Sequence, residues 1–233
     1  MATQFKHNYK EFGDEAVQKR VKDMLHFRDE VDVENAHVKF SYDNRKTGAL
    51  VPSVSLIPVA DCCNCSACKN GCYDIRNVCF QKTVQKARAN NSAIAHKDPD
   101  KFFREVSGRM KSLRYLRFFV GGDVINYGFF EGMVKCCNEN PHCDVLAFTK
   151  AWVIPARWID ANGELPSNLH IILSEWRGVK VYNPHNLPTS TPVWPGDEPK
   201  DGIWCPGDCS ACAEAGGGCW GLKKGERVLF EAH

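Results

Sequence analysis

The sequence has no long apolar run, and this absence bounds what the protein can be. Its longest apolar stretches fall far short of the roughly 20 residues that span a bilayer, so we expect no membrane partner. The first 20 residues contain no apolar segment of the kind that directs secretion. We therefore expect a cytoplasmic protein.

The sequence also lacks an excess of either charge and the common nucleotide-binding motifs. Thirty Lys and Arg against 28 Asp and Glu give a formal net charge of +2. A globally basic nucleic-acid binder and an acidic disordered chain are both disfavoured. There is no Walker loop, no G-x-G-x-x-G and no nucleophile elbow.

What the sequence does have is cysteine, 13 in all. In a chain of 233 residues with no secretory signal and an odd count, these are poor candidates for a disulfide framework. Six lie between Cys62 and Cys79, three between Cys136 and Cys143, and four between Cys205 and Cys219. Such grouping in a reducing compartment indicates metal ligation or catalysis.

The first and last groups have ligand-like spacing. Cys62, Cys65, Cys68 and Cys72 follow C-x2-C-x2-C-x3-C, the run by which bacterial ferredoxins bind iron–sulfur clusters, with Tyr73 in place of the usual proline. The last group is spaced C-x3-C-x2-C-x6-C and consists of Cys205, Cys209, Cys212 and Cys219. Thiolates two or three residues apart on a loop can reach neighbouring corners of one cubane.

Two other interpretations of the cysteines stay open. A pair from each group, such as Cys65 and Cys68 with Cys209 and Cys212, would make a four-cysteine zinc site. Packing as small hydrophobic residues is the better interpretation for Cys136, Cys137 and Cys143, while Cys63 and Cys79 are undecided. Eight cysteines exceed the four that one zinc takes. We therefore favour one or two 4Fe-4S clusters, with ligands possibly exchanged between the two groups.

Hydrophobic periodicity predicts alternating helices and strands. The helices are expected over 13–28, 77–92, from Asp98-Pro99 to about Leu113, over 127–138 with Asn126 as N-cap, and over 155–161. The strands are expected over 38–42, 53–57, 115–120, 145–149 and 169–174. This order predicts an α/β fold, a partial or open parallel β/α barrel-like sheet with an irregular cysteine-rich C-terminal region.

One domain accounts for the whole chain in this interpretation. Residues 1–37 form an N-terminal helical extension, 38–182 a β/α core with the first cysteine loop, and 183–233 an irregular region that closes the metal site. Polar residues follow the predicted strands, and strand carboxyl ends share one edge of a parallel sheet. We expect a pocket there that contains Gly121, Gly122, Asp123, Lys150 and Glu175.

Several of these segments resemble a phage and prophage family labelled gene product 88. The resemblance runs over about 38–221 and rests on the following segments: Thr47-Gly48, 53–56, Cys72-Tyr73, Gly122-Asp123, 148–150, and Cys205-Pro206 through Cys219-Trp220. It implies a phage or mobile-element origin, hence the host cytoplasm, and no particular reaction.

A weaker likeness is to radical S-adenosylmethionine enzymes. These place a three-cysteine loop after the first strand of a partial barrel and use a Gly-Gly-acidic turn to hold the amino group of the cofactor. The likeness implies that role for Gly121, Gly122 and Asp123. The first loop departs from the family because it reads C-x2-C-x3-C, and the family's C-x3-C-x2-C occurs only at Cys205, Cys209 and Cys212.

The segment 76–117 is basic, with eleven Lys and Arg against three acids. It is a candidate nucleic-acid face. The leading hypothesis is a phage-type iron–sulfur protein with a redox or electron-transfer role, with a redox partner or a small-molecule substrate; whether it is an enzyme stays open. The alternatives are a zinc-stabilised nucleic-acid-binding module and a radical S-adenosylmethionine-like enzyme.

Overall fold

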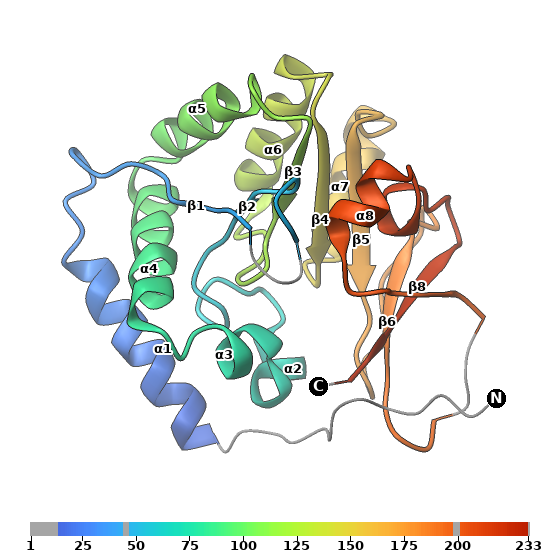
Figure 1. Cartoon of the computed structure of the whole chain (residues 1–233), viewed down its shortest axis with the longest axis horizontal. Helices are drawn as coiled ribbons and strands as arrows, with labels where there is room; N and C mark the ends of the chain where they lie inside the picture. Colours follow the sequence, from blue (N-terminus) through green and yellow to red (C-terminus); the bar gives the residue numbers. More distant parts are fainter. Residues whose placement is uncertain (1–13, 44–46, 198–200, 233) are drawn as a thin grey trace.

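A computed structural model describes residues 14–43, 47–197 and 201–232. Within these ranges one open sheet of eight strands runs through the molecule in the order β1-β2-β3-β4-β5-β6-β8-β7, and only β1 is antiparallel to its neighbour (Figure 1). The strands are β1 Phe40–Ser41, β2 Ser53–Val54, β3 Tyr115–Phe118, β4 Asp144–Thr149, β5 Leu169–Ser174, β6 Thr189–Val193, β7 Ile203–Trp204 and β8 Arg227–Glu231. The predicted fold class, an open and largely parallel α/β sheet, is confirmed.

Helices connect the strands and cover mainly one face of the sheet (Figure 1). They are α1 Asp14–Asp29, α2 Cys65–Cys68, α3 Tyr73–Asn77, α4 Lys82–Lys97, α5 Pro99–Met110, α6 Tyr127–Glu139, α7 Val153–Asn162 and α8 Cys209–Glu214, with short 3-10 turns η1 Lys69–Gly71 and η2 Gly218–Trp220. Two predicted caps are present: Asp98 accepts from Lys101 N at 2.9 Å, and Asn126 accepts from Phe129 N at 2.8 Å.

The two faces of the sheet bury different partners because side chains alternate along a strand. Leu116 and Phe118 face the main core, together with Phe102, Phe130 and Met133 of the covering helices. The other face carries Tyr115, Leu146, Ile172 and Val228, and it packs against Trp220, Ala213 and the last cysteine group. The C-terminal cysteine region is therefore the second layer on this face.

The C-terminal region is more regular than expected. Strands β6, β7 and β8 extend the sheet where the sequence predicts an irregular region over 183–233. Pro192 discourages a strand prediction because proline cannot donate to a ladder. Within β6, only Thr189 and Ser190 pair with β5, so Pro192 lies in the part of β6 that has β8 alone beside it.

Candidate metal-binding thiol clusters

The last four cysteines converge, and we call Cys205, Cys209, Cys212 and Cys219 the C-terminal thiol cluster. All four line one cavity of about 20 Å³ between α8, η2 and the sheet. Leu146, Trp220 and Val228 complete its apolar lining. The backbone of Cys205 donates to Leu229 O at 2.9 Å, which anchors this cysteine to β8. Residues spread over 205–219 thus present four sulfur donors to one small space.

Local sequence explains this convergence. Asp208 caps α8 by accepting from Ala211 N at 3.0 Å, which starts the turn that carries Cys209 and Cys212. Gly216 and Gly218 then adopt φ of +60° and +57°, a conformation that favours glycine. A Cβ atom at Gly218 would lie 2.7 Å from Cys212 Sγ. Glycine at 218 therefore lets the chain turn back closely enough to bring Cys219 to the cluster.

The thiols of this cluster influence one another electrostatically. The pKa of Cys219 is raised to about 12, mainly by burial and also by the neighbouring Cys205, Cys209 and Cys212, while Arg117 opposes the shift. Burial also raises the pKa of Cys212, again with Cys205 and Cys209 adding to it. At neutral pH the thiols of Cys212 and Cys219 are therefore protonated until a cation replaces their protons.

Three cysteines of the first group, Cys62, Cys68 and Cys72, also lie close together, and we call them the strand-end thiol cluster. It follows β2 and is built from α2, η1 and the start of α3; the side chain of Cys65, the fourth predicted ligand, lies outside the described side chains. Burial raises the pKa of Cys62 well above its usual value, with Asp123, Cys72 and Cys68 adding to it. Burial raises the pKa of Cys72 to about 12, with Asp74 and Cys68 as further causes.

The two clusters occupy different places. Figure 1 shows α2 and α3 beyond the ends of the central strands, whereas α8 lies against the sheet. The thiols that perturb Cys62 and Cys72 all belong to the strand-end cluster, and those that perturb Cys212 and Cys219 all belong to the C-terminal cluster. The two cysteine groups therefore lie apart in the described structure; exchange of ligands between them, and a zinc site with a pair from each, stay predictions that this separation disfavours.

Within the described part of the chain, neither cluster is a formed coordination sphere. The twelve cysteines whose side chains are described form no disulfide. Among the described side chains, no three Cys, His, Asp or Glu residues already stand in a metal-binding arrangement.

Asp123 belongs to a buried junction between loops. Its carboxylate accepts from Thr149 Oγ1 at 2.5 Å, from Lys150 N at 2.8 Å and from Val124 N at 2.7 Å. Burial raises its pKa, and these three hydrogen bonds oppose the shift. Asp123 is only 4% exposed, so its carboxylate is held inside the protein and is not a solvated turn residue. It joins the ends of β3 and β4 beside Cys62.

Atoms of the protein itself occupy the space on the inner side of the predicted Gly121-Gly122 turn. A Cβ atom at Gly121 would lie 1.7 Å from Asp74 Oδ2, and one at Gly122, whose φ is +78°, would lie 2.6 Å from Leu56 Cβ. The carbonyl of Gly121 accepts from Leu56 N at 3.0 Å. The turn does not fit the amino group of S-adenosylmethionine, because its inner side is already packed, and nothing supports the radical S-adenosylmethionine likeness.

Lys150 and Glu175 have different polar partners. Lys150 Nζ lies 5.5 Å from the centre of the Trp176 ring, and its carbonyl accepts from Asn64 of the first cysteine loop. Glu175 Oε2 accepts from Thr191 Oγ1 at 2.6 Å, toward β6. The structure thus joins the strand-end cluster to Asp123 and Lys150, as expected of strand carboxyl ends, and gives Glu175 a different partner.

The remaining cysteines are packed or bonded individually. Cys136, Cys137 and Cys143 are buried in the main core, as predicted. Cys79 is fully buried and donates to Asp74 Oδ2 at 3.3 Å, and Cys63 donates to Val124 O at 3.0 Å.

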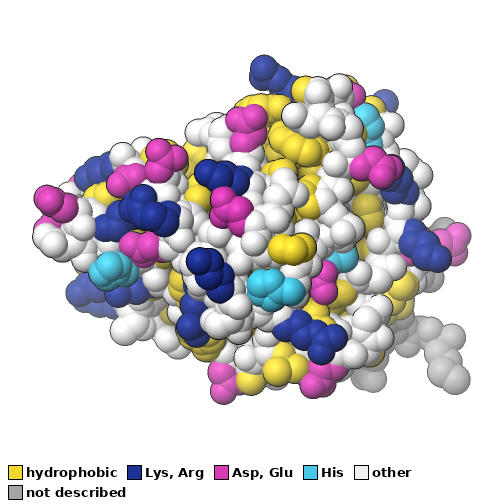
Figure 2. Space-filling view, turned by 90° about the horizontal axis from the view of Figure 1, so that it is seen from above, with side chains coloured by type: hydrophobic (Ala, Val, Ile, Leu, Met, Phe, Trp, Pro, Cys, Tyr) yellow, Lys and Arg dark blue, Asp and Glu magenta, His cyan; other side chains and the backbone are white. Residues whose placement is uncertain are grey.

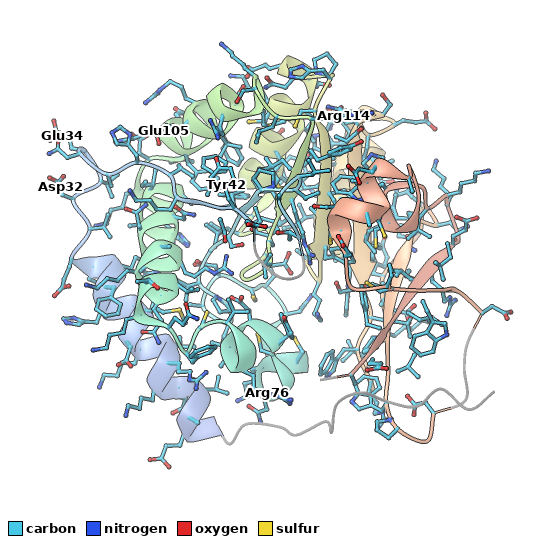
Figure 3. The ribbon with its side chains drawn as sticks, viewed as in Figure 1. Asp32, Glu34, Tyr42, Arg76, Glu105 and Arg114 are labelled. Carbon is cyan, nitrogen blue, oxygen red and sulfur yellow. The ribbon has the colours of Figure 1, made fainter. Side chains whose placement is uncertain are left out.

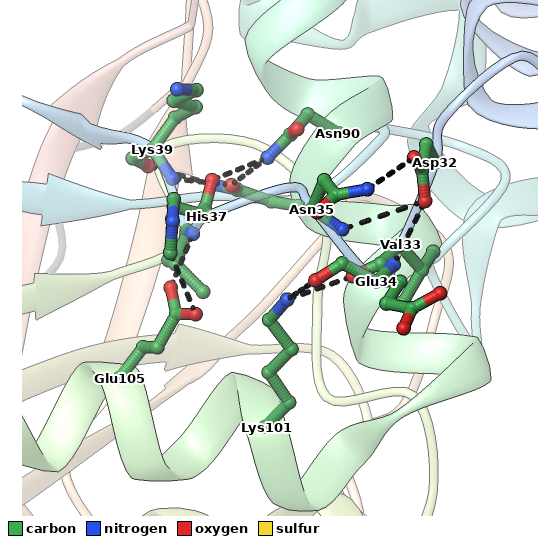
Figure 4. Close-up of polar contacts among 11 residues, drawn as sticks. Asp32, Val33, Glu34, Asn35, His37, Lys39, Asn90, Lys101 and Glu105 are labelled. Atoms are coloured by element: carbon green, nitrogen blue, oxygen red, sulfur yellow. Dashed lines mark hydrogen bonds and ion pairs between the residues drawn. The ribbon is translucent and has the colours of Figure 1, made fainter.

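The basic segment 76–117 does not form one face. Its ends diverge: Figure 3 shows Arg76 at the bottom of the view and Arg114 in its upper part. Figure 2 shows Lys and Arg interspersed with Asp and Glu on the face it presents. Lys101 is buried and donates to Val33 O at 2.8 Å and Glu34 O at 2.7 Å, which holds the N-terminal segment onto α5 (Figure 4). Arg88 and Arg117 are also buried.

Arg117 is the site residue that sequence reasoning missed. It is the lone charged residue in the apolar strand 115–120, and a charge in the middle of a buried strand signals a specific partner. In the structure its Nη1 lies 3.6 Å from Cys209 Sγ. The lone charge is visible in the sequence, but its partner Cys209 is identified only by the structure.

Comparison with known proteins identifies the family. The family model described as Gene product 88 matches residues 24–203. The chain belongs to the gene product 88 family. The match includes the strand-end cluster and Asp123 but ends before the C-terminal thiol cluster, so it stops short of the expected limit of about residue 221. No curated protein and no solved structure matches the chain.

The description of the gene product 88 family names no activity, so a function has to be inferred from the two thiol clusters. No helix among the described residues combines the length and apolar character that crossing a bilayer requires.

Proposed function

We propose that this gene product 88 protein is a cytoplasmic iron–sulfur protein with a redox or electron-transfer role. Each thiol cluster would hold one centre: Cys62, Cys65, Cys68 and Cys72 at the strand ends, and Cys205, Cys209, Cys212 and Cys219 on the sheet face. Bound clusters would supply one-electron chemistry. The chain's own part is to present the thiolates, exclude water and set the charge around them.

The observation that carries this proposal is the convergence of four sulfur donors on one cavity in the C-terminal cluster. The donor set fits, because thiolates are the ligands that iron–sulfur clusters and zinc select. The lining fits too, since Trp220 and Leu146 make an apolar shell of the kind that restricts solvent access. Cys62 Sγ in the strand-end cluster accepts a backbone hydrogen bond from Val59 N at 3.3 Å, which favours the thiolate form and partly opposes the effect of burial on its pKa.

A second candidate at the C-terminal cluster is zinc. Four cysteines that line one small cavity are also the ligand set of a closed structural zinc site. In this version the C-terminal cluster is a closed structural zinc site, and only the strand-end cluster binds iron. The nucleic-acid role is not proposed again, because the cations of 76–117 are dispersed or buried.

The test is metal and sulfide analysis of full-length protein purified without oxygen. We expect brown protein that contains iron and acid-labile sulfide and gives an electron paramagnetic resonance signal after reduction. Iron and sulfide together with zinc would support the mixed version. Colourless protein with zinc alone would contradict the redox role, and protein without any metal after reconstitution would contradict both versions.

A further inference from the structure

Arg117 is a buried cation that has no anionic partner in the described structure. It is only 7% exposed, and its Nε is buried without a hydrogen-bond partner. Its guanidinium carbon lies 4.8 Å from the centre of the Phe148 ring. Among the described side chains no carboxylate forms an ion pair with it; its nearest polar contact is Cys209 Sγ at 3.6 Å.

This environment is costly for a guanidinium. Arginine stays protonated in proteins, so it cannot avoid the cost by losing its charge. Buried charges are normally paired, because removal from water costs several kcal/mol per ion. Arg88, which is equally buried, follows the rule through an ion pair with Asp74 at 2.9 Å. Arg117 lacks such a carboxylate and lies instead against a cavity lined by four thiols.

A metal bound in that cavity would place a negatively charged centre beside Arg117. Four thiolates carry four negative charges, so a divalent ion bound by all of them forms a centre with a net charge of −2. An iron–sulfur cluster bound by four thiolates is likewise anionic. Metal binding by the four thiolates would therefore supply the negative partner that no carboxylate provides to Arg117.

We infer that Arg117 is the counter-cation of the C-terminal thiol cluster, where it stabilises the metal-bound thiolates and offsets the negative charge of the loaded centre. The inference rests on the proposed function, because it requires a metal in this cluster. It makes Arg117 a positioning residue that acts through Cys209 and Cys219.

The test uses the full chain with Arg117→Met, and Arg114→Met as the matched control. Arg114 is an exposed arginine just before β3. Both changes are made in a Cys68→Ala background, so that only the C-terminal cluster keeps all its thiols. The probe is Co²⁺ added to metal-free protein, followed by its thiolate charge-transfer absorption and by chelator competition. Thermal unfolding of the metal-free proteins is the second readout.

The inference predicts that removing the charge of Arg117 weakens the metal-bound protein but does not destabilise the metal-free protein. Arg117→Met should weaken Co²⁺ binding about ten- to a hundredfold, the range for a lost charge-assisted interaction, while Arg114→Met changes it less than about twofold. Metal-free Arg117→Met should unfold at the same temperature as Arg114→Met or higher, because an uncompensated charge has been removed. Arg117→Lys should retain most of the affinity, and it replaces Arg117→Met should that variant fail to fold.

Three outcomes would overturn the inference. Equal Co²⁺ affinity in Arg117→Met and Arg114→Met would show that Arg117 does not act on the centre, while leaving the proposed function intact. A lower unfolding temperature of metal-free Arg117→Met would assign it a packing role. Absence of Co²⁺ binding in the Cys68→Ala parent itself would contradict the metal at this cluster, and the inference with it.

Discussion

Arg88→Met is expected to lower the free energy of unfolding by about 3–5 kcal/mol, the cost of leaving a buried charge without its partner. Arg88 Nη2 lies 2.9 Å from Asp74 Oδ1, and the two side chains are 8% and 2% exposed. Asp74 lies at the start of α3, next to Cys72. Removing the guanidinium leaves this carboxylate buried beside the strand-end cluster. Urea unfolding followed by circular dichroism measures the effect.

Two companion variants isolate the ion pair. Lys82→Met removes an exposed cation from the same helix and should change stability by less than about 0.5 kcal/mol. The double variant Arg88→Met with Asp74→Asn should recover much of the loss, because no buried charge remains. A double variant no more stable than Arg88→Met alone would show that side-chain packing, and not charge, dominates.

Gly121→Ala should destabilise the protein by about 1–3 kcal/mol through overpacking. The new methyl group would lie 1.7 Å from Asp74 Oδ2. Asp74 cannot simply move aside, because Arg88 and Cys79 both hold its carboxylate. Backbone strain is not the cause, since Gly121 does not have a positive φ.

The control for Gly121→Ala is Gly108→Ala. Gly108 lies within α5, where a Cβ atom would meet nothing within 4 Å. Alanine there should stabilise the protein by about 0.5–1 kcal/mol through its better helix propensity. Chemical denaturation of both variants should therefore give changes of opposite sign. Equal stability of Gly121→Ala and the parent would mean that the Gly121–Asp74 contact is loose.

Features set by local sequence were predictable. The caps at Asp98 and Asn126 were predicted because capping depends on a side chain and a backbone only two or three residues apart. Strand β5 was predicted over its full length, 169–174, because Leu169, Ile171 and Leu173 alternate with residues on the other face. The partial barrel-like sheet followed from the order of such elements.

Features set by tertiary pairing were not predictable. Strand β6 depends on β8, which lies more than 30 residues later in the chain, and Pro192 conceals it locally. The spacing of the cysteines indicated two thiol groups but not their separation, since spacing says nothing about which face of a sheet a loop reaches. The contact of Asp74 with Gly121 likewise cannot be predicted from one sequence. The turn was therefore predicted to bind a cofactor, although Asp74 already occupies the space beside it.

The central claim is that the chain holds two independent thiol centres, and one measurement tests it most directly. Metal and sulfide per chain are determined for anaerobic Cys68→Ala, Cys212→Ala and the parent. The account predicts that each variant loses one centre and retains the other, so that their two losses together equal the content of the parent. Loss of all metal in both variants would show a single shared centre and would contradict the separation seen here.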